Sequence, residues 1–584
     1  MSRGTFVFLL LMAFGSVTWA ETAVFGPIDT DSIWTVDGSP YVISGDVEVV
    51  GGATLTIEAG VLVQGRAGAG LVVGGEDAGD TGALVALGRL GQGIRFDARV
   101  RDEPWGGILF RETTIEPQFG PDGEYVSGSI LSFCRVERCE EPIVMQGAVA
   151  YLASTTVIGP SLPFGAGVRV ELRDAQTLKT FRADGLEVRD SRGFGVYIDG
   201  GTGHQIADSA FNGNTQGAYI LSPSRDDDRM TIRLERCEFV GNGTSGTTPS
   251  NGGGLLLVTF GDAELLECVF LANQADSNGG AIWGYAETLV LQGCEFDRNQ
   301  AGHIGGAIEI ESDSMTIDDC VFVENVAVGA GGAVFSLGSD RQELFVNNSR
   351  FTGNESPYGG AMFVRDLSPR IEQSEFTSNA STIDGGAIRF LSSNPVTLDS
   401  NRFLDNSTGG SGGAISFDGI QARDGVDIVG NTFAGNIARL GGAVYTTDAS
   451  GDDTVFSFAE RGGLVNTFAS NTAELGDDIY HAGPVDIDAT GVCWGTTVPV
   501  AIASRIYDGA DEPGLGIVRF DPVAADCDVC RADLDGDGAL TVFDFLAFSG
   551  LFGLGDPQAD FDGDGRLTLF DFLAFQAEFD AGCP

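Results

Sequence analysis

Two acidic segments near the end of the chain have the residue types and the spacing of calcium-binding loops. Residues 533–544 read DLDGDGALTVFD, and residues 560–571 read DFDGDGRLTLFD. A twelve-residue loop can supply calcium with oxygen atoms from positions 1, 3, 5, 7, 9 and 12, and glycine at position 6 allows the sharp turn. The ligand positions hold Asp533, Asp535, Asp537, Ala539, Thr541 and Asp544 in the first segment, and Asp560, Asp562, Asp564, Arg566, Thr568 and Asp571 in the second.

The carboxylates of each segment lie so close together in sequence that they would repel one another strongly unless a cation sat between them. Ala539 would contribute its backbone carbonyl, and Thr541 a hydroxyl group or a bridging water. The alternative is an acidic turn that binds no ion. We therefore predict two calcium ions as the cofactors of residues 533–584.

Helices are predicted after each loop but not before it. Residues 543–552 and 570–579 carry apolar residues at spacings of three and four, which is typical of helices. A duplicated unit of loop and exiting helix resembles a dockerin, a module that binds cohesin domains on other proteins. The resemblance implies recognition through loop positions 10 and 11, which here are Val542-Phe543 and Leu569-Phe570. Well-known dockerins often carry small hydroxyl residues there, so we expect either an unusual cohesin-like receptor or a different protein.

The cysteines around this module suggest a disulfide bond that holds its two ends together. The ending Gly582-Cys583 is similar to a dockerin variant with a terminal Gly-Cys, and Cys527 or Cys530 could pair with Cys583. Export would permit such a disulfide. A redox or zinc role for Cys527 and Cys530 is disfavoured because no second ligand pair accompanies them.

A repeated phrase in the middle of the chain predicts the main fold. Each copy contains Phe, two residues, Asn, a turn of variable length and then Gly-Gly-Ala-Ile or a close variant. Clear copies begin at Phe270, Phe296, Phe322, Phe351, Phe376, Phe403 and Phe433, and weaker ones at Phe211, Phe239 and Phe468. Successive phenylalanines lie 25 to 35 residues apart, so each copy is too short to bury a core alone and the copies must stack.

The stacked elements are expected to be strands. Short alternating apolar runs such as residues 289–291 and 315–317 indicate strands of about three to five residues. Such strands, repeated once per coil, form an all-β parallel β-helix, a solenoid whose coils lie about 4.8 Å apart. Phenylalanines would then stack inside, asparagines would form a hydrogen-bonded ladder, and paired glycines would allow tight bends. A leucine-rich or helical solenoid is the competing interpretation, but the helical period is missing.

These phrases resemble the repeats of chlamydial polymorphic outer-membrane proteins and related bacterial right-handed β-helix proteins. The resemblance predicts a β-helix at residues 21–523, with an N-terminal start at about 30–110, a repeat region at about 205–480 and a closing coil at about 485–523. A linker at 524–532 would lead to the small α-helical dockerin-like domain at 533–584. The chlamydial proteins end in a membrane-embedded barrel, and no such barrel is expected here.

The start of the chain and its charge bear on where the protein works. Residues 1–20 have a short basic start, an apolar run and small residues at the end, which predicts a secretory signal peptide and a secreted, extracellular or cell-surface location. The net charge is −50, with 83 acidic and 33 basic residues. Such a charge disfavours nucleic acid and anionic membranes as partners, and no apolar run is long enough for a transmembrane helix.

The remaining cysteines and the histidines offer only weak candidates for chemistry. Cys237, Cys268, Cys294 and Cys320 each lie two residues before a repeat phenylalanine, which favours buried thiols in the core, with disulfides and a metal site as alternatives. His204, His303 and His481 are far apart and are expected in solvated turns rather than in a catalytic site. No catalytic residue is assigned.

The residues after each glycine pair should alternate inward and outward. Ile310, Val364, Phe390 and Phe417 would point inward. One outward column would hold Trp283, Glu309, Phe335, Phe363, Arg389, Ser416 and Tyr445, and a second Tyr285, Glu311, Leu337, Arg365, Leu391, Asp418 and Thr447. Aromatic rings beside carboxylates and guanidinium groups suit a glycan or protein ligand, and the alternative is that another loop covers this face.

Taken together, these patterns favour a non-catalytic surface or matrix protein that is attached through its dockerin-like module. The alternative is an extracellular carbohydrate-active enzyme, a polysaccharide lyase or a glycoside hydrolase, delivered by the same module. The two differ in whether exposed carboxylates and arginines converge on one coil face.

Overall fold

The computed structural model describes residues 21–160, 165–173, 179–222, 231–243, 250–338, 342–393, 395–420, 425–448, 456–524, 532, 534, 540–554, 559, 561 and 566–581. The predicted signal peptide, most of the predicted linker, half of the first acidic loop and five of the twelve residues of the second lie outside these ranges. Contacts divide the chain into a first unit, Met1–Val290, and a second unit, Leu291–Pro584.

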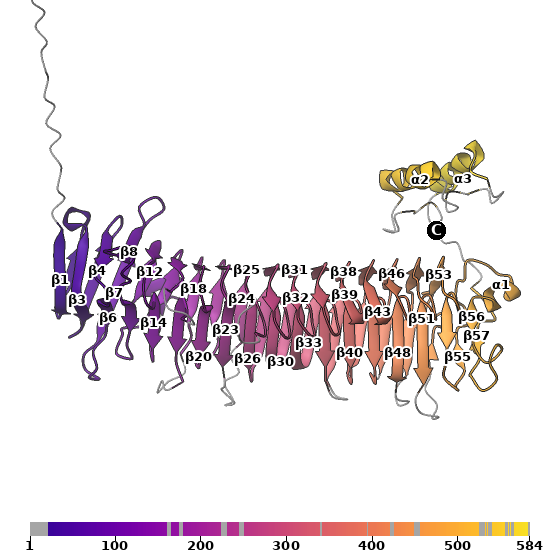
Figure 1. Cartoon of the computed structure of the whole chain (residues 1–584), viewed down its shortest axis with the longest axis horizontal. Helices are drawn as coiled ribbons and strands as arrows, with labels where there is room; N and C mark the ends of the chain where they lie inside the picture. The colour runs from indigo at the N-terminus through magenta and orange to yellow at the C-terminus, as the bar shows by residue number, and fades with distance from the viewer. Residues whose placement is uncertain are drawn as a thin grey trace, which may run out of the picture. The chain divides into compact units, whose positions relative to one another are not determined.

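Both units contain parallel β-solenoids, in which each strand pairs with the equivalent strand of the next coil (Figure 1). The first coil contains β1 (Thr22–Ile28) and β2 (Ser32–Trp34), and after the 3₁₀ turn η1 (Val36–Gly38) the second coil begins with β3 (Tyr41–Val49). Strand β3 pairs with β1 on one side, and on the other side with two strands of the next coil. Most of the later coils have three strands, which stack into three sheets, and the closing coils have strands in the first and second sheets.

The first sheet contains the strands after the glycine pairs. In the first unit these are β6 (Gly70–Val73), β9 (Gly107–Phe110), β14 (Ile143–Gln146), β17 (Val168–Glu171), β20 (Phe194–Asp199), β23 (Gln216–Ser222), β26 (Leu255–Thr259) and the start of β30 (Ile282–Gln292). In the second unit they are β33 (Ile308–Asp318), β36 (Val334–Leu337), β40 (Met362–Arg365), β44 (Ile388–Leu391), β48 (Ile415–Ile420), β51 (Val444–Asp448), β54 (Ile479–His481) and β56 (Ile506–Tyr507).

The second sheet follows the first along each coil. Its strands in the first unit are β4 (Ala53–Glu58), β7 (Gly82–Leu87), β12 (Ile130–Ser132), β15 (Tyr151–Ala153), β18 (Arg182–Asp184), β21 (Gln205–Ala207), β24 (Ile232–Glu235) and β27 (Asp262–Leu266). In the second unit they are the end of β33, β37 (Glu343–Asn347), β41 (Ser368–Glu372), β45 (Val396–Asp399), β49 (Val426–Val429), β52 (Phe456–Ser457), β55 (Ile487–Asp488) and β57 (Val518–Arg519).

The third sheet carries the repeat phenylalanines. Its strands in the first unit are β5 (Leu62–Gly65), β8 (Ile94–Ala98), β13 (Cys134–Val136), β16 (Thr156–Ile158), β19 (Glu187–Arg189), β22 (Ala210–Asn212), β25 (Glu238–Val240) and β28 (Val269–Leu271). In the second unit they are β31 (Glu295–Asp297), β34 (Val321–Val323), β38 (Arg350–Thr352), β42 (Glu375–Thr377), β46 (Arg402–Leu404), β50 (Thr432–Ala434) and β53 (Thr467–Ala469).

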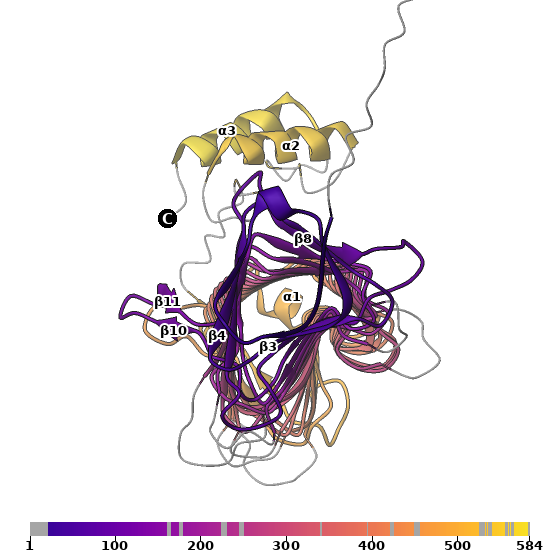
Figure 2. The ribbon, with the colours of Figure 1, turned by 90° about the vertical axis from the view of Figure 1, so that its left-hand side faces the viewer.

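Smaller elements decorate the coils. Short strands follow the repeat asparagines and form a narrow side sheet in the second unit: β32 (Gln300–Ala301), β35 (Val326–Ala327), β39 (Glu355–Tyr358), β43 (Ala380–Asp384) and β47 (Ser407–Thr408), with β29 (Gln274–Ala275) in the first unit. The antiparallel hairpin of β10 (Gln118–Phe119) and β11 (Tyr125–Ser127) projects from the side of the first unit (Figure 2). Helix α1 (Pro499–Ala503) belongs to the closing coils, and α2 (Val542–Leu554) and α3 (Leu569–Ala581) form the C-terminal module.

The predicted phenylalanine stack forms the core. In the first unit Phe239 and Phe270 stack with ring centroids 4.7 Å apart. In the second unit the repeat phenylalanines from Phe296 to Phe468 stack in series, with centroids 4.6 to 5.0 Å apart. All of these rings are fully buried, so the apolar column contributes burial in every coil and fixes the strand register.

The predicted asparagine ladder is also present. Each repeat asparagine donates from Nδ2 to Oδ1 of the next, for example Asn325 to Asn354 at 3.0 Å and Asn354 to Asn379 at 2.9 Å. The same Nδ2 donates to the carbonyl of a repeat phenylalanine, as Asn354 does to Phe322 at 3.1 Å. Because these side chains are fully buried, the ladder satisfies polar groups that have no access to water.

The paired glycines are required at two different points of the same turn. Gly305 has a φ of +64°, a backbone conformation that side chains rarely adopt. Gly306 lacks this φ, but a Cβ placed on it would collide with the carbonyl of Gly332 in the next coil. The first glycine therefore shapes the turn, and the second allows neighbouring coils to approach closely.

The four repeat cysteines are buried thiols that form no disulfide within the described residues, as the preferred interpretation expected. They belong to a second polar column, because the equivalent position two residues before phenylalanine is Ser349, Ser374, Asn401 or Asn431 in later coils. In the first unit the thiols of Cys237 and Cys268 donate to backbone carbonyls of the preceding coil at 3.4 and 3.5 Å. Cysteine thus takes the place of a hydroxyl or amide side chain in this column.

The asparagine ladder ends on a buried carboxylate. Oδ1 of Asp478 accepts hydrogen bonds from Asn471 at 3.0 Å and from the Arg505 guanidinium at 2.8 Å. Oδ2 is buried and has no hydrogen-bond partner in the described part of the chain. Burial raises the pKa of Asp478 to about 6, although Arg505 and the Asn471 hydrogen bond act in the opposite direction.

Replacing one ladder asparagine should destabilise the solenoid strongly. In Asn379→Ala, the buried groups that bond Asn379 lose their partner, and we expect a loss of roughly 3 kcal/mol because each unsatisfied buried group costs roughly 1–3 kcal/mol. Urea unfolding followed by circular dichroism measures this loss. Gln300→Ala, at an exposed strand position, serves as the control and should change stability little. Equal stability of the two variants would contradict the ladder's role.

Asp478 should make the closing coils more stable at lower pH. Its pKa is about 6 in the folded state and about 3.9 when unfolded. The folded state therefore binds the proton more tightly, so the contribution is fully present below about pH 4 and is lost as the pH rises through 6. Asp478→Asn, which cannot ionise, serves as the reference. The thermal midpoint of the wild type minus that of this variant should therefore increase as the pH is lowered from 7.5 to 5. A difference that does not change with pH would disprove the assignment.

Candidate functional site

Only part of the predicted calcium site lies within the described residues. Asp533, Asp535, Asp537, Ala539, Asp560, Asp562 and Asp564 fall outside them, as do Cys527, Cys530 and Cys583. Thr541, Asp544, Arg566, Thr568 and Asp571 are described. In the described part of the chain, no group of three or more His, Cys, Asp or Glu side chains is arranged to hold a metal ion.

The last acidic residue of each loop is fully buried. Oδ1 of Asp544 accepts the backbone N–H of Leu534 at 2.7 Å, and its Oδ2 accepts the N–H of Thr541 at 2.7 Å. Oδ2 of Asp571 likewise accepts the N–H of Thr568 at 2.6 Å. Each aspartate therefore ties loop backbone to the first turn of its helix, where a carboxylate also interacts favourably with the helix dipole.

The two helices begin and pack in the same way. Thr541 and Thr568 cap α2 and α3 by accepting the N–H groups of Phe543 and Phe570, both at 3.1 Å. Between the helices Phe548 stacks on Phe575, with centroids 4.5 Å apart. Both helices are predicted correctly, and each extends about one residue earlier and two residues later than expected.

A matched set of apolar side chains remains exposed on this module. The exposed fractions are 65% for Val542, 61% for Phe543, 62% for Leu546, 68% for Leu569, 67% for Phe570 and 49% for Leu573. In each helix the set occupies positions i, i+1 and i+4, and residues four apart lie on one face. We call these residues the twin apolar patch. It includes both predicted recognition pairs, and large exposed apolar areas are unusual on isolated soluble domains.

The predicted outward columns of the first sheet are only partly open. The predicted inward residues Ile310, Val364, Phe390 and Phe417 are buried. Trp283, Tyr285, Glu309, Phe335, Arg389, Asp418 and Tyr445 are half-buried, and Glu311 and Arg365 are exposed. The expectation of exposure is wrong for Phe363, which is 8% exposed, and for Ser416, which is 1% exposed.

Neighbouring coils cover Phe363. Its ring stacks on Phe335 with centroids 5.2 Å apart, and the Arg389 guanidinium lies 5.9 Å from its centre. Arg389 also lies over the Tyr358 ring at 4.6 Å and forms ion pairs with Asp384 at 3.2 Å and Asp418 at 2.7 Å. These groups are engaged with one another, so this part of the face is a packed surface rather than an open site.

The expectation of solvated histidines is correct only for His303, which is exposed. His204 and His481 are buried. Nδ1 of His204 accepts the N–H of Phe181 at 3.2 Å, and Nε2 faces the carbonyl of Gly200 at 3.0 Å. Burial lowers the pKa of His204 to about 4, so this ring is a neutral part of the core.

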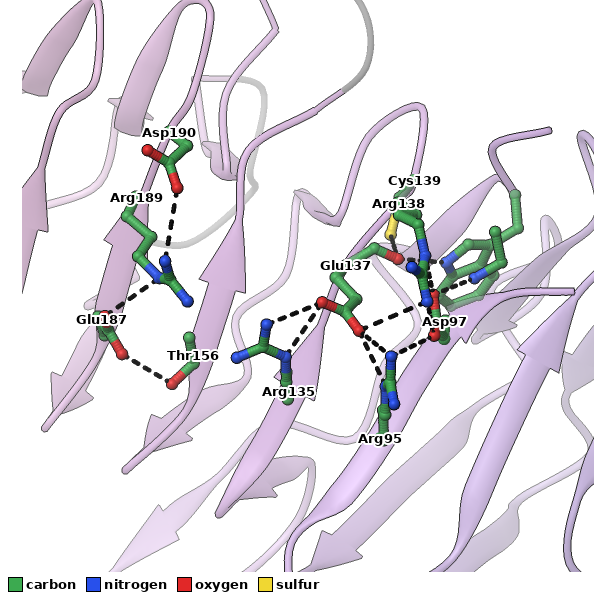
Figure 3. Close-up of polar contacts among 12 residues, drawn as sticks. Arg95, Asp97, Arg135, Glu137, Arg138, Cys139, Thr156, Glu187, Arg189 and Asp190 are labelled. Carbon is green, nitrogen blue, oxygen red and sulfur yellow. Dashed lines mark hydrogen bonds and ion pairs between the residues drawn. The ribbon is translucent and has the colours of Figure 1, made fainter. Parts of the chain in front are cut away.

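Three arginines surround two buried carboxylates on the third sheet of the first unit (Figure 3). Arg95 contacts Asp97 at 2.8 Å and Glu137 at 2.6 Å, Arg135 contacts Glu137 at 2.9 Å, and Arg138 pairs with Asp97. Burial opposes ionisation of Glu137, but the hydrogen bonds from Arg135 and Arg95 outweigh it and lower its pKa. The cluster locks adjacent coils together.

A polar groove of about 1030 Å³ opens at the end of the first-sheet strands in the first unit. We call it the N-terminal groove. Its lining includes Glu76, Arg111, Glu112, Thr113, Gln146, Glu171, Arg173 and Asp199. Arg173 donates to Asp199 at 2.6 Å, Gln146 donates to Glu171 at 3.4 Å, and Arg111 faces Glu76 at 3.7 Å.

No motif in the sequence predicted this groove. Its residues lie in irregular coils before the repeat region, where the Phe-x-x-Asn phrase is missing and no motif marks them. The available signal was the placement of charged residues directly after short apolar strands, as in Arg111-Glu112 after β9 and Glu171 at the end of β17.

One of three comparisons with known proteins gave a match. Residues 166–368 match a family model described as a right handed beta helix region. This match identifies the solenoid as right-handed. No curated protein and no solved structure matches the chain. None of the helices within the described ranges combines the length and apolar character that crossing a bilayer requires.

Proposed function

We propose that this protein is a secreted, non-catalytic β-helix that is assembled on a protein receptor through a calcium-dependent, dockerin-like C-terminal module. The observation that carries the proposal is the twin apolar patch. Two helices with the same cap and the same buried aspartate present the same three exposed apolar positions. A duplicated apolar surface of this kind gains stability when a partner covers it.

The occupant we propose is a cohesin-like protein with an apolar binding face. Val542-Phe543 and Leu569-Phe570 occupy the loop positions that dockerins use for recognition, and the resemblance therefore supports this partner. Aromatic side chains in such positions contribute large buried area at low entropic cost. A second copy of this chain is the competing occupant, which self-association would reveal.

The acidic loops support calcium as the element that orders the module. Asp544 and Asp571 bind loop backbone in the described residues, as the last ligand of a closed calcium loop would. Calcium would neutralise the remaining carboxylates and hold each loop against its helix.

The enzyme alternative finds less support in the N-terminal groove. Glycoside hydrolysis needs two carboxyl groups that flank the same bond. Asp199 is bound to Arg173, and Glu171 lies 3.4 Å from Arg169. These carboxylates are paired with cations rather than aimed at a shared point, which favours a binding role.

The full-length protein should bind two calcium ions, and Asp533→Ala with Asp560→Ala should abolish this binding because each removes a first-position ligand. Isothermal titration calorimetry measures the uptake. Glu238→Ala, an exposed carboxylate of the solenoid, is the control and should leave it unchanged. Absence of calcium uptake by the wild type would refute the calcium site.

Binding to a receptor should depend on the twin apolar patch. Surface plasmon resonance with a panel of purified cohesin domains should detect a complex of the wild type in calcium. Phe543→Ser with Phe570→Ser should weaken it by roughly thirtyfold or more, because buried aromatic anchors carry much of an interface's energy. Val328→Ser, at an exposed apolar residue of the solenoid, should bind like the wild type. Undiminished binding by the double variant, or no binding to any cohesin, would overturn this assignment.

A further inference from the structure

The N-terminal groove runs across successive coils rather than into one of them. Phe110, Met145, Val170 and Ile198 follow one another in strand register. The groove residues that come after these strands therefore also stack, and Glu76 extends the series to the coil of β6. Five coils separated by about 4.8 Å give a polar track roughly 19 Å long, which suits an extended chain molecule better than a compact one.

The groove offers hydrogen-bond donors and acceptors in adjacent pairs. Arg173 lies beside Asp199, and Gln146 lies beside Glu171. Such pairs can donate to one hydroxyl group and accept from the next one, and their mutual contacts hold them in place before a ligand arrives. Neighbouring hydroxyl groups on a sugar ring present this combination of donor and acceptor.

The charge of the groove selects against anions. Four carboxylates, from Glu76, Glu112, Glu171 and Asp199, face two guanidinium groups, from Arg111 and Arg173. The whole chain carries a net charge of −50. An acidic polymer would meet repulsion both in the groove and on approach, so the chemistry favours an uncharged ligand.

An aromatic platform lies beside the last groove residue. Tyr197 and Tyr219 stack with ring centroids 4.9 Å apart, and Phe194 packs against both at 5.3 and 5.4 Å. All three rings are half-buried. The hydroxyl group of Tyr197 lies 3.5 Å from Oδ2 of Asp199, which joins the platform to the polar track.

We infer that the N-terminal groove binds a neutral polysaccharide chain. The chain lies along the polar track, its hydroxyl groups bonded by Arg173, Asp199, Gln146 and Glu171, and one sugar ring rests against Tyr197 and Tyr219. Flat apolar faces on rings that also carry hydroxyl groups match this combination of aromatic and paired polar side chains. The site extends the proposed function, because the protein attached through its C-terminal module would also bind a polysaccharide.

The test is calorimetric titration of the full-length protein with five hexasaccharides: cellohexaose, xylohexaose, mannohexaose, laminarihexaose and the anionic hexagalacturonate. At least one neutral hexasaccharide should bind, and hexagalacturonate should not. Tyr197→Ala should weaken the neutral ligand by roughly tenfold or more. Asp199→Asn, which keeps the shape of the side chain, should weaken it similarly by disturbing the pair with Arg173.

Tyr480→Ala is the matched control, because Tyr480 is a half-buried tyrosine that stacks on Tyr445 at 5.4 Å in the second unit. It should bind like the wild type, and circular dichroism should show all variants folded. Binding unaffected by both groove substitutions, binding of hexagalacturonate alone, or no binding at all would overturn the inference. None of these results depends on the C-terminal module, so a failure here leaves the proposed attachment intact.

Discussion

The structure depends on one constraint: each coil must repeat the backbone of its neighbours at the same height and in the same register. Parallel strands bond only to the coil before and the coil after, so each side chain lies against the side chains at the equivalent positions of the neighbouring coils. This is why phenylalanine meets phenylalanine in the third sheet and asparagine meets asparagine at the turn. The paired glycines serve the same constraint, since a Cβ on the second would push neighbouring coils apart.

The columns differ in how much change they tolerate. The phenylalanine and asparagine columns keep one residue type over many coils, because each member fills the same volume or satisfies the same buried groups. The polar column two residues before phenylalanine accepts Cys, Ser or Asn, because it needs only a small side chain able to bond a nearby backbone carbonyl. Asp478 ends the asparagine ladder with a charged group, and Arg505 supplies the partner that another asparagine would have supplied.

Much of this architecture could be predicted from the sequence, because residues that stack in one column recur at regular intervals along the chain. The phenylalanine stack, the asparagine ladder, the inward positions of Ile310 and Phe390 and both C-terminal helices follow from spacing alone. The burial of Phe363 could not be predicted, because it depends on where the long side chain of Arg389 lies in the next coil. His204 was misplaced for a related reason, since its neighbours Phe181 and Gly200 belong to irregular turns.

The two candidate sites also differ in whether a repeated pattern marks them in the sequence. The residues of the twin apolar patch could be predicted, because the module is duplicated and its two copies carry matching apolar residues at equivalent positions. The N-terminal groove was invisible, because its paired side chains lie 25 or more residues apart and no repeat brings them into alignment. A site formed by irregular coils has no repeated motif in the sequence, so it can be recognised only in the three-dimensional structure, where the coils are stacked.

The sameness of the coils in the second unit has an evolutionary consequence. The coils that begin at Phe351, Phe376 and Phe403 present nearly identical upper and lower surfaces to their neighbours. Duplication or deletion of one whole coil would therefore again stack phenylalanine on phenylalanine and asparagine on asparagine. The number of coils in this stretch can change through unequal recombination without compensating changes in the core, whereas the irregular coils around the groove cannot be exchanged in this way. Selection can adjust the extent of the regular part and the specificity of the irregular part separately.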